Sequence, residues 1–478
     1  MKIVMVTSEA NPLCKSGGLA DVTYSLSREL NKIGEEAIIV LPYYKKIKEN
    51  PKVKVKFLSS FSIAMSWRQQ YCGIFQTKID GIRYYLLDNE YYFNRDELYG
   101  HYDDAERFAF FSLAALEALK QLKVHPDIIH VHDWQASMIP CLIKERFRED
   151  PFLGNIKTVL TIHNPAFKGF MDKYYLNNFY GLNDYIYDKG NVRFEGMVST
   201  LKAAIYYADI ITTVSPTHRE ELLTYNTSQG LNYCLELRKD DFFGILNGID
   251  VVEFDPSNDK NIAELYSADG FAKAKIANKK QVLEKFNLAN RRGPVYGIVS
   301  RLTYQKGFDL VFDNIDYLVQ NNGTLLVLGS GEKDIEQRLE KVRAKYPKNI
   351  GIYIGYNDQL AHQIYAGSDF FIMPSLFEPC GIGQMIAQRY GSLPIVRETG
   401  GLKDTIVGYD GKNAKKATGF MFQPYTGMAL GQQLEMTREL YGDREKMKKV
   451  IANAMKLDRS WTVSAKKYVE AYKKALAK

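Results

Sequence analysis

The chain has 478 residues, which is more than one hydrophobic core normally supports and favours two domains. Hydrophobic residues make up 46% and charged residues 25% of the chain, as in ordinary soluble globular proteins. The net charge of +7 is a mild bias without a basic tail, so it suits anionic small molecules and gives no indication of nucleic-acid binding. No apolar stretch reaches the roughly 20 residues that a membrane helix needs.

The cysteines are too scattered for a disulfide framework or a zinc site. There are five, and no two form a CxxC pair. A metal centre is therefore not expected, and a reducing compartment suits the thiols best. The first residues read directly as a strand rather than as a secretory signal. Together these features predict a cytoplasmic location and no membrane partner.

Short, continuous apolar runs alternate with longer amphipathic stretches. Continuous runs are typical of strands buried on both faces of a parallel sheet. We predict strands at residues 3–6, 37–41, 127–131, 158–162, 210–214, 295–299, 324–328, 350–354, 370–373 and 393–396. Helices are predicted at residues 22–33, 105–122, 308–319, 335–346 and 461–477. This alternation predicts an α/β fold with doubly wound sheets.

The alternation pauses near residues 247–259 and begins again at Pro294. We therefore predict a first Rossmann-like domain over residues 1–245 and a second over residues 246–457. Residues 458–478 are predicted to be a terminal helix. Asn247-Gly248 lies at the boundary and indicates a tight turn, although Asn247 could also touch a ligand there.

The segment Lys15-Ser16-Gly17-Gly18-Leu19-Ala20-Asp21 follows the first predicted strand. Two glycines before a helix let the backbone approach a ligand, and the helix N-terminus offers N–H groups to an anion. Lys15 would then meet a phosphate, but an ordinary glycine turn explains the same residues. Residues 399–404 repeat the Gly-Gly pattern in the second half, although Gly-Gly is common in such loops. Two halves facing each other would enclose an interdomain cleft at the carboxyl ends of their strands.

Two further segments carry charge at predicted strand ends. Arg301 and Lys306 follow the strand at residues 295–299, where two cations beside a helix suit a diphosphate or a solvated basic loop. Glu378 follows the strand at residues 370–373 and precedes a glycine turn, where it could face a sugar or interact with the helix N-terminus. Neither GxxxxGK[ST] nor GxGxxG is present, which argues against a nicotinamide oxidoreductase.

Three of the seven histidines also fall at predicted strand ends. His130 is predicted to be a buried, hydrogen-bonded structural residue. His163 and Asn164 begin a loop and are better placed for substrate. Asp133 offers an acceptor for a sugar hydroxyl. Tyr356, after the strand at residues 350–354, could stack on a nucleobase or simply be a surface tyrosine.

Taken in this order, the segments resemble bacterial glycogen synthases and plant starch synthases over nearly the whole chain. The motifs that carry the resemblance are residues 8–22, Ser300-Arg301-Leu302 with Gln305-Lys306-Gly307, and Glu378-Pro379-Cys380-Gly381. The resemblance implies a GT-B fold, with two Rossmann-like domains facing across a cleft. It also implies that the terminal helix crosses back to the first domain.

The implied activity is retaining, metal-independent transfer of glucose from ADP-glucose to the non-reducing 4-hydroxyl of an α-1,4-glucan such as glycogen, with no cofactor. The resemblance gives catalytic roles to Glu378, His163, Arg301 and Lys306. It gives substrate-binding roles to Lys15, Gly17, Gly18, Asp21, Asp133, Asn164, Asn247, Tyr356, Cys380, Gly381 and Ile382.

The sequence leaves other functions open. Another nucleotide sugar or acceptor, a nucleotide-sugar epimerase and a catalytically silent glucan-binding protein all fit the same architecture. The silent protein is disfavoured because Arg301, Lys306 and Glu378 are all present. The choice between ADP-glucose and UDP-glucose cannot be read from these residues.

Overall fold

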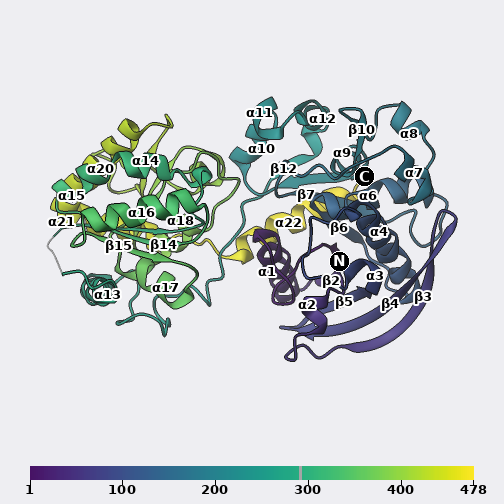
Figure 1. Ribbon diagram of the computed structural model, residues 1–478, viewed down its shortest axis with the longest axis horizontal. Helices are drawn as coiled ribbons and strands as arrows, with labels where there is room; N and C mark the ends of the chain where they lie inside the picture. Colours follow the sequence, from purple (N-terminus) through teal and green to yellow (C-terminus); the bar gives the residue numbers. More distant parts are fainter. Residues whose placement is uncertain (290–292) are drawn as a thin grey trace. The chain divides into compact units, whose positions relative to one another are not determined.

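The computed structural model describes residues 1–289 and 293–478, which form two compact units (Figure 1). The first unit contains residues 1–247 together with residues 461–478, and the second contains residues 248–460. The chain therefore passes from one unit to the other between Asn247 and Gly248 and again between Ser460 and Trp461.

The first unit is built on a nine-stranded sheet with the order β12-β11-β7-β6-β1-β2-β5-β4-β3. Its strands are β1 (Lys2–Val6), β2 (Glu36–Pro42), β3 (Lys56–Met65), β4 (Arg68–Ile79), β5 (Ile82–Asp88), β6 (Ile128–His132), β7 (Lys157–Ile162), β11 (Ile210–Thr213) and β12 (Phe242–Gly244). All neighbours pair in parallel as far as β5, and β5-β4-β3 are antiparallel. The parallel strands are almost wholly buried, which is why they read as continuous apolar runs.

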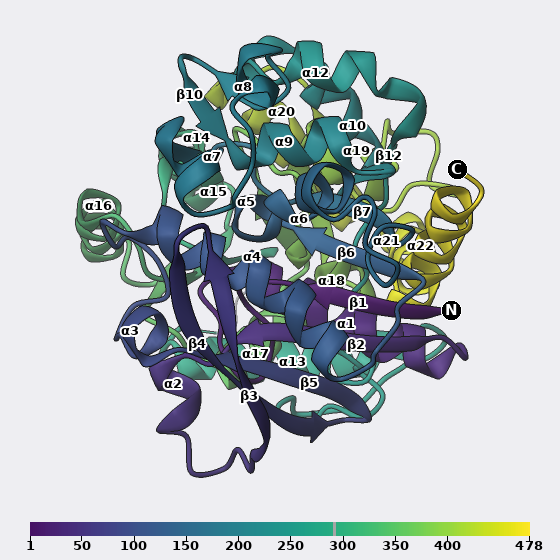
Figure 2. The same ribbon diagram turned by 90° about the vertical axis from the view of Figure 1, so that its right-hand side faces the viewer.

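The sequence analysis missed the antiparallel edge of this sheet. β3 is mostly exposed or half-buried and carries serines between its apolar residues, so it forms no continuous apolar run. The long β3–β4 pair is conspicuous in Figure 2. A second, three-stranded antiparallel sheet was also missed because its strands have only two or three residues each: β8 (Phe170–Met171), β9 (Arg193–Phe194) and β10 (Met197–Ser199).

Helices cover the sheet of the first unit. The longest are α1 (Gly18–Lys32), α4 (Asp104–Gln121) and α22 (Trp461–Leu476). The shorter ones are α2 (Lys45–Lys48), α3 (Glu90–Phe93), α5 (Asp133–Ala136), α6 (Met138–Cys141), α7 (Tyr174–Asn178), α8 (Tyr185–Asp188), α9 (Thr200–Tyr207), α10 (Pro216–Leu222), α11 (Tyr225–Ser228) and α12 (Asn232–Leu237).

The terminal helix α22 packs on α1, β7 and β11 of the first unit (Figure 1). Its buried residues recur every three or four positions, as expected for a helix with one apolar face. Tyr472 on that face reaches the buried His130, with Oη 2.9 Å from Nδ1. The other ring nitrogen of His130 lies 2.6 Å from Thr161 Oγ1, which agrees with the prediction of a buried structural histidine.

The second unit has a six-stranded, all-parallel sheet with the order β15-β14-β13-β16-β17-β18. The strands are β13 (Val295–Val299), β14 (Thr324–Gly329), β15 (Ile350–Ile354), β16 (Phe370–Met373), β17 (Leu393–Arg397) and β18 (Phe420–Phe422). The helices are α13 (Phe271–Lys285), α14 (Phe308–Asp313), α15 (Ile315–Gln320), α16 (Lys333–Lys345), α17 (Asp358–Gly367), α18 (Gly383–Arg389), α19 (Gly400–Thr405), α20 (Gly427–Gly442) and α21 (Arg444–Met455).

The single helix predicted at residues 308–319 is wrong, because the structure divides it at Asn314 into α14 and α15. The Asn314 side chain donates to the carbonyl oxygens of Leu310 and Gly427, at 2.9 and 2.8 Å. An asparagine that binds a carbonyl of the preceding turn competes with the helix's own hydrogen bonds. At the break between α14 and α15, Asn314 therefore connects these helices to the first residue of α20, Gly427.

Candidate functional site

In both units most of the candidate residues follow strands at or next to the point where the order of parallel strands reverses, whereas Asn247 and Tyr356 follow the edge strands β12 and β15. In the first sheet the chain runs outward from β1 to β2 on one side and from β6 to β7 and β11 on the other. In the second sheet the same reversal falls between β13 and β16. Ligands of open α/β sheets bind at the carboxyl ends of strands at such a point, because the two loops there diverge and leave a crevice.

The loop after β1 is organised around the buried carboxylate of Glu9. This carboxylate accepts hydrogen bonds from Ser16 Oγ at 2.6 Å, Gly17 N at 3.1 Å and Tyr99 Oη at 2.7 Å, and also from Ser16 N. Lys15 projects from the same loop with half of its side chain exposed, and its Nζ lies 2.7 Å from Asp21. Asp21 also accepts from Asn11, so it ties the lysine to the start of α1.

The two Gly-Gly pairs have different physical roles. A Cβ atom added at Gly17 or Gly18 would meet no described atom within 4 Å, and Gly17 has an extended φ of −147°. Packing within the described residues therefore does not require glycine there, and the open space would admit close approach of a ligand. At Gly401 a Cβ would lie 2.1 Å from the carbonyl oxygen of Cys380, so this second pair is required for packing.

Asp133 and His163 meet at the carboxyl ends of β6 and β7. The Asp133 carboxylate accepts from the backbone N–H groups of His163 and Asn164, at 2.7 and 3.3 Å. Burial and, to a smaller extent, the negative charge of Glu9 raise the pKa of Asp133 to about 7, against the opposing effect of these two hydrogen bonds. Glu9 follows β1 and Asp133 follows β6, so this charge effect indicates that the two loops lie close to each other.

His163 is one of a row of histidines. Its Nε2 lies 3.0 Å from Nδ1 of His132, and the His132 ring lies 4.2 Å from that of His130. Burial lowers the pKa of His130 and of His163 to about 3 and that of His132 below its usual range. The three histidines are therefore neutral at physiological pH. His163 can form a hydrogen bond with a ligand without carrying a charge.

The second unit brings Lys306 and Glu378 together across its reversal point. Lys306 Nζ lies 2.5 Å from Glu378 Oε2, and Ser375 Oγ donates to the same oxygen at 3.2 Å. Glu378 is only 7% exposed, so this pair keeps a buried carboxylate from being uncompensated. The sequence placed these residues 72 positions apart on two loops, and the parallel pairing of β13 with β16 makes them neighbours.

Close backbone packing holds these two loops together. Gly307 has a φ of +77°, and a Cβ there would lie 2.3 Å from the carbonyl oxygen of Pro374. Leu376 N donates to Gln305 O at 2.9 Å, and Arg397 Nε donates to Ser375 O at 2.9 Å. Arg301 is exposed beside them, and no described side chain forms an ion pair with it.

The turn after Glu378 leads into α18. Gly381 has a φ of +68°, and Ile382 is 45% exposed. Cys380 is buried, so its side chain packs inside the unit. Its carbonyl oxygen and that of Gly381 accept from Gln384 Nε2, at 3.2 and 3.0 Å. The turn thus has a fixed shape that presents Ile382 outward.

Asn247 and Tyr356 differ in their exposure. Asn247 is 7% exposed, and its side-chain oxygen accepts no hydrogen bond within residues 1–289 and 293–478. The Tyr356 ring is 86% exposed, with Oη 3.4 Å from Asp358 Oδ1. An exposed flat ring of this kind can stack on a base, and it is equally typical of a surface tyrosine.

Glu9 is the main residue to which the sequence analysis assigned no role. A carboxylate three residues after a continuous apolar strand was a usable signal, because a charge that becomes buried must find partners. Its partner Tyr99 lies 90 positions away, so the contact could not be read from the sequence.

Of the described helices, none is both long and apolar enough to cross a membrane.

The chain matches known proteins along its whole length. Residues 2–237 match the family model described as the starch synthase catalytic domain, and residues 279–457 match that of glycosyl transferases group 1. A glycogen synthase of Anoxybacillus flavithermus is 42% identical, and the match covers 100% of this chain and 98% of the relative. One of Clostridium botulinum is 43% identical, with 99% of both chains covered.

The chain belongs to the glycogen synthase family of glycosyltransferases. The solved structure of the catalytic domain of starch synthase IV from Arabidopsis thaliana, bound to ADP and acarbose, has 31% identity and a TM-score of 0.89. That match covers 100% of this chain and 99% of the plant domain. The predicted α/β architecture and GT-B fold with two Rossmann-like domains are thereby confirmed.

The two glycine pairs can be separated by substitution. Gly17→Ala should leave the free energy of unfolding within about 0.5 kcal/mol of the wild type, because the added methyl meets only open space. Gly401→Ala should cost about 1–3 kcal/mol by overpacking. Transferase activity should fall in Gly17→Ala despite its intact fold. A fully active Gly17→Ala would mean that no ligand approaches this glycine.

Asp133 should make stability depend on pH. Its pKa is raised from 3.8 to about 7, so the folded chain holds the proton more tightly than the unfolded chain. Its contribution is present below about pH 4 and is lost as the pH rises through about 7. The Tm of Asp133→Asn should therefore gain on that of the wild type between about pH 4 and 8. Asp240→Asn, on an exposed residue, is the control, and parallel Tm curves for all three proteins would contradict the assignment.

Proposed function

We propose that this protein transfers glucose from ADP-glucose to the non-reducing 4-hydroxyl of an α-1,4-glucan, with retention, and so elongates glycogen. The observation that carries the proposal is the ion pair of Lys306 with the buried Glu378 at the strand reversal of the second unit, with the exposed Arg301 on the same loop as Lys306. The relatives named glycogen synthase and the plant domain bound to ADP and acarbose support the same donor and acceptor. The proposed site of action is the cytoplasm.

The departing diphosphate is the main electrostatic demand of this reaction. As the bond from the anomeric carbon to the diphosphate oxygen breaks, negative charge grows on that oxygen. Arg301 and Lys306 follow the same strand and supply two positive charges, so no metal ion or other cofactor is needed for this step. The N–H groups of Gly381 and Ile382 are further candidate donors to the sugar phosphate, beside the buried Cys380.

Glu378 is better suited to stabilising charge than to attacking the sugar. Lys306 and Ser375 both bind its Oε2, and each of these interactions reduces the nucleophilicity of the carboxylate. We therefore favour a front-face route, in which the leaving phosphate accepts the proton of the acceptor hydroxyl while the new glycosidic bond forms on the same face. Glu378 then faces the donor glucose and opposes the positive charge of the oxocarbenium-like transition state.

The first unit would supply neutral hydrogen-bonding groups and one cation. His163 is uncharged at neutral pH and would bind a glucose hydroxyl, with Asn164 and Asp133 beside it. Lys15 would lie near the donor phosphates, because Gly17 and Gly18 leave room for a ligand against the backbone. Asp21 would hold Lys15 in place until the donor arrives.

Asn247 and Tyr356 would bind the two ends of the donor molecule, which are the glucose and the adenine. Asn247 has a buried side-chain oxygen to which no described group donates, and a glucose hydroxyl would satisfy it. Tyr356 would stack on the adenine ring.

A direct assay tests the proposed function. Purified full chain is incubated with glycogen and either ADP-glucose or UDP-glucose, and nucleoside diphosphate release and glucan mass are both measured. We expect ADP release coupled to growth of the glucan, with a clear preference for ADP-glucose. Interconversion of the sugar without polymer growth would instead indicate an epimerase. No diphosphate release with either donor would overturn the proposal.

Arg301→Ala is the cleanest test of the diphosphate contact. Arg301 is exposed, so its loss should leave the Tm unchanged while kcat falls by about 10²–10³-fold. Arg444→Ala, which removes an exposed arginine of the same unit, is the matched control. Near-wild-type turnover of a folded Arg301→Ala would contradict the contact.

Lys306→Ala should lower both kcat and stability, because it leaves Glu378 buried without its cation. The double variant Lys306→Ala with Glu378→Gln should recover stability but not kcat.

A further inference from the structure

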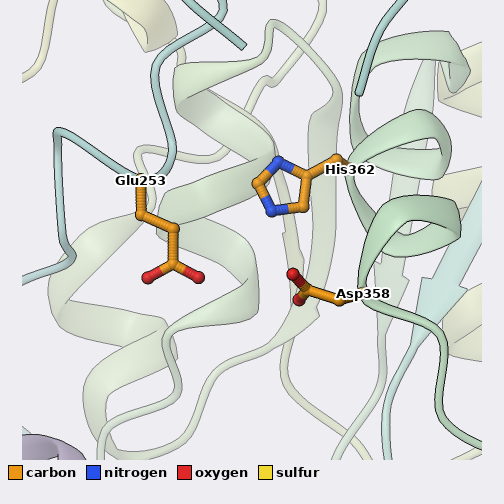
Figure 3. Close-up of side chains that lie close together, drawn as sticks. All are labelled: Glu253, Asp358 and His362. Atoms are coloured by element: carbon orange, nitrogen blue, oxygen red, sulfur yellow. The ribbon is translucent and has the colours of Figure 1, made fainter. Parts of the chain in front are cut away.

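Three potential metal ligands converge in the second unit beside α17. Glu253, Asp358 and His362 each offer one ligand atom, and these atoms all lie within 4.8 Å of one another. Figure 3 shows one ring nitrogen of His362 turned toward the carboxylates of Glu253 and Asp358. None of the three residues has a role in the proposed transfer reaction.

The His362 ring is held in one orientation. It is 2% exposed and stacks on Phe254 with the ring centroids 4.9 Å apart and the planes at 18°. Its Nδ1 lies 2.7 Å from Asp259 Oδ2, which also accepts from Tyr390 Oη at 2.6 Å. An ionised carboxylate can only accept, so Nδ1 is the nitrogen that carries a proton.

This tautomer leaves a buried lone pair on the other nitrogen. Nε2 of His362 has no hydrogen-bond partner in the part of the chain that the structure describes. The side chains nearest to it in the cluster are two carboxylates, which offer no proton at neutral pH. A buried nitrogen without a partner is costly in the neutral ring, so the arrangement calls for a positively charged occupant, which is either a proton or a metal ion.

The donor set indicates which cation fits. One imidazole nitrogen and two carboxylate oxygens suit Zn²⁺ and similar first-row divalent ions, whereas Ca²⁺ and Mg²⁺ prefer oxygen alone. Metal-binding histidines commonly donate their second N–H to a carboxylate, and Asp259 already occupies that position. Asp358 and His362 are four residues apart on α17 and therefore share one helix face.

Glu253 comes from a segment that is itself fixed to the unit. Arg389 donates to the carbonyl oxygen of Phe254 at 2.6 Å and to that of Val251 at 3.3 Å. We propose that Glu253, Asp358 and His362 form a binding site for a divalent transition-metal ion, Zn²⁺ being the best match. The ion clamps the segment at residues 251–259, just after the unit boundary, to α17. Its role is to stabilise the second unit, separately from catalysis.

Calorimetric titration of the EDTA-treated full chain with ZnCl₂ tests the site. The wild type should bind one ion with saturation, and Glu253→Gln and Asp358→Asn should each weaken binding at least about tenfold. Glu264→Gln, on an exposed carboxylate of the same unit, is the matched control and should bind as the wild type does. Zn²⁺ should raise the Tm of the wild type and of Glu264→Gln, but not that of Glu253→Gln.

The outcomes separate the possible occupants. A wild type that binds no Zn²⁺ would overturn the proposal and leave a proton on His362 Nε2 as the occupant. Binding that survives both Glu253→Gln and Asp358→Asn would place the ion elsewhere and would also overturn it. Co²⁺ titration gives an independent signature: visible d–d absorption without a thiolate charge-transfer band, because all five cysteines are buried away from this cluster. Because Glu253 is exposed, Glu253→Gln should fold normally, which keeps a loss of binding interpretable.

Discussion

Parallel strand pairing is the constraint on which the rest of this protein depends. In a parallel sheet every strand ends at the same edge, and each must be followed by a crossover to the next. Among the parallel strands of each unit, the order reverses once, between β1 and β6 in the first unit and between β13 and β16 in the second. Most of the charged and polar residues proposed for glucosyl transfer follow these strands or their immediate neighbours, whereas Asn247 and Tyr356 follow the edge strands β12 and β15.

Three acids that are buried or half-buried shape these strand ends, and each is stabilised in a different way. Glu9 is surrounded by N–H and O–H donors and folds the glycine loop around itself. Glu378 is compensated by the full charge of Lys306. Asp133 has only two backbone donors, and burial raises its pKa to about 7. A carboxylate therefore serves as loop organiser, ion-pair partner or titratable group, according to what surrounds it.

His362 lies outside the residues proposed for glucosyl transfer, and its protonation is likewise decided by the groups around it. A carboxylate on one side of the ring sets its proton, and two further carboxylates gather on the other side. Metal binding at this position would tie the start of the second unit to one of its helices. Such a clamp would be independent of the proposed diphosphate contact, because that contact is assigned to Arg301 and Lys306, which are not part of the metal cluster.

The sequence by itself determined the buried parallel strands, the α/β class and the residues of the motifs, because continuous apolar runs and local loop chemistry are written in neighbouring positions. It did not reveal the exposed β3–β4 edge, whose apolar residues are interrupted by polar ones. It also treated the pairs Gly17-Gly18 and Gly400-Gly401 as equivalent, whereas only the packing around Gly401 distinguishes them. The contacts of Lys306 with Glu378, Glu9 with Tyr99, and Asp259 with His362 join residues 72, 90 and 103 positions apart. Only the tertiary structure decided these pairs, because strand order and burial bring together side chains that local sequence patterns cannot relate.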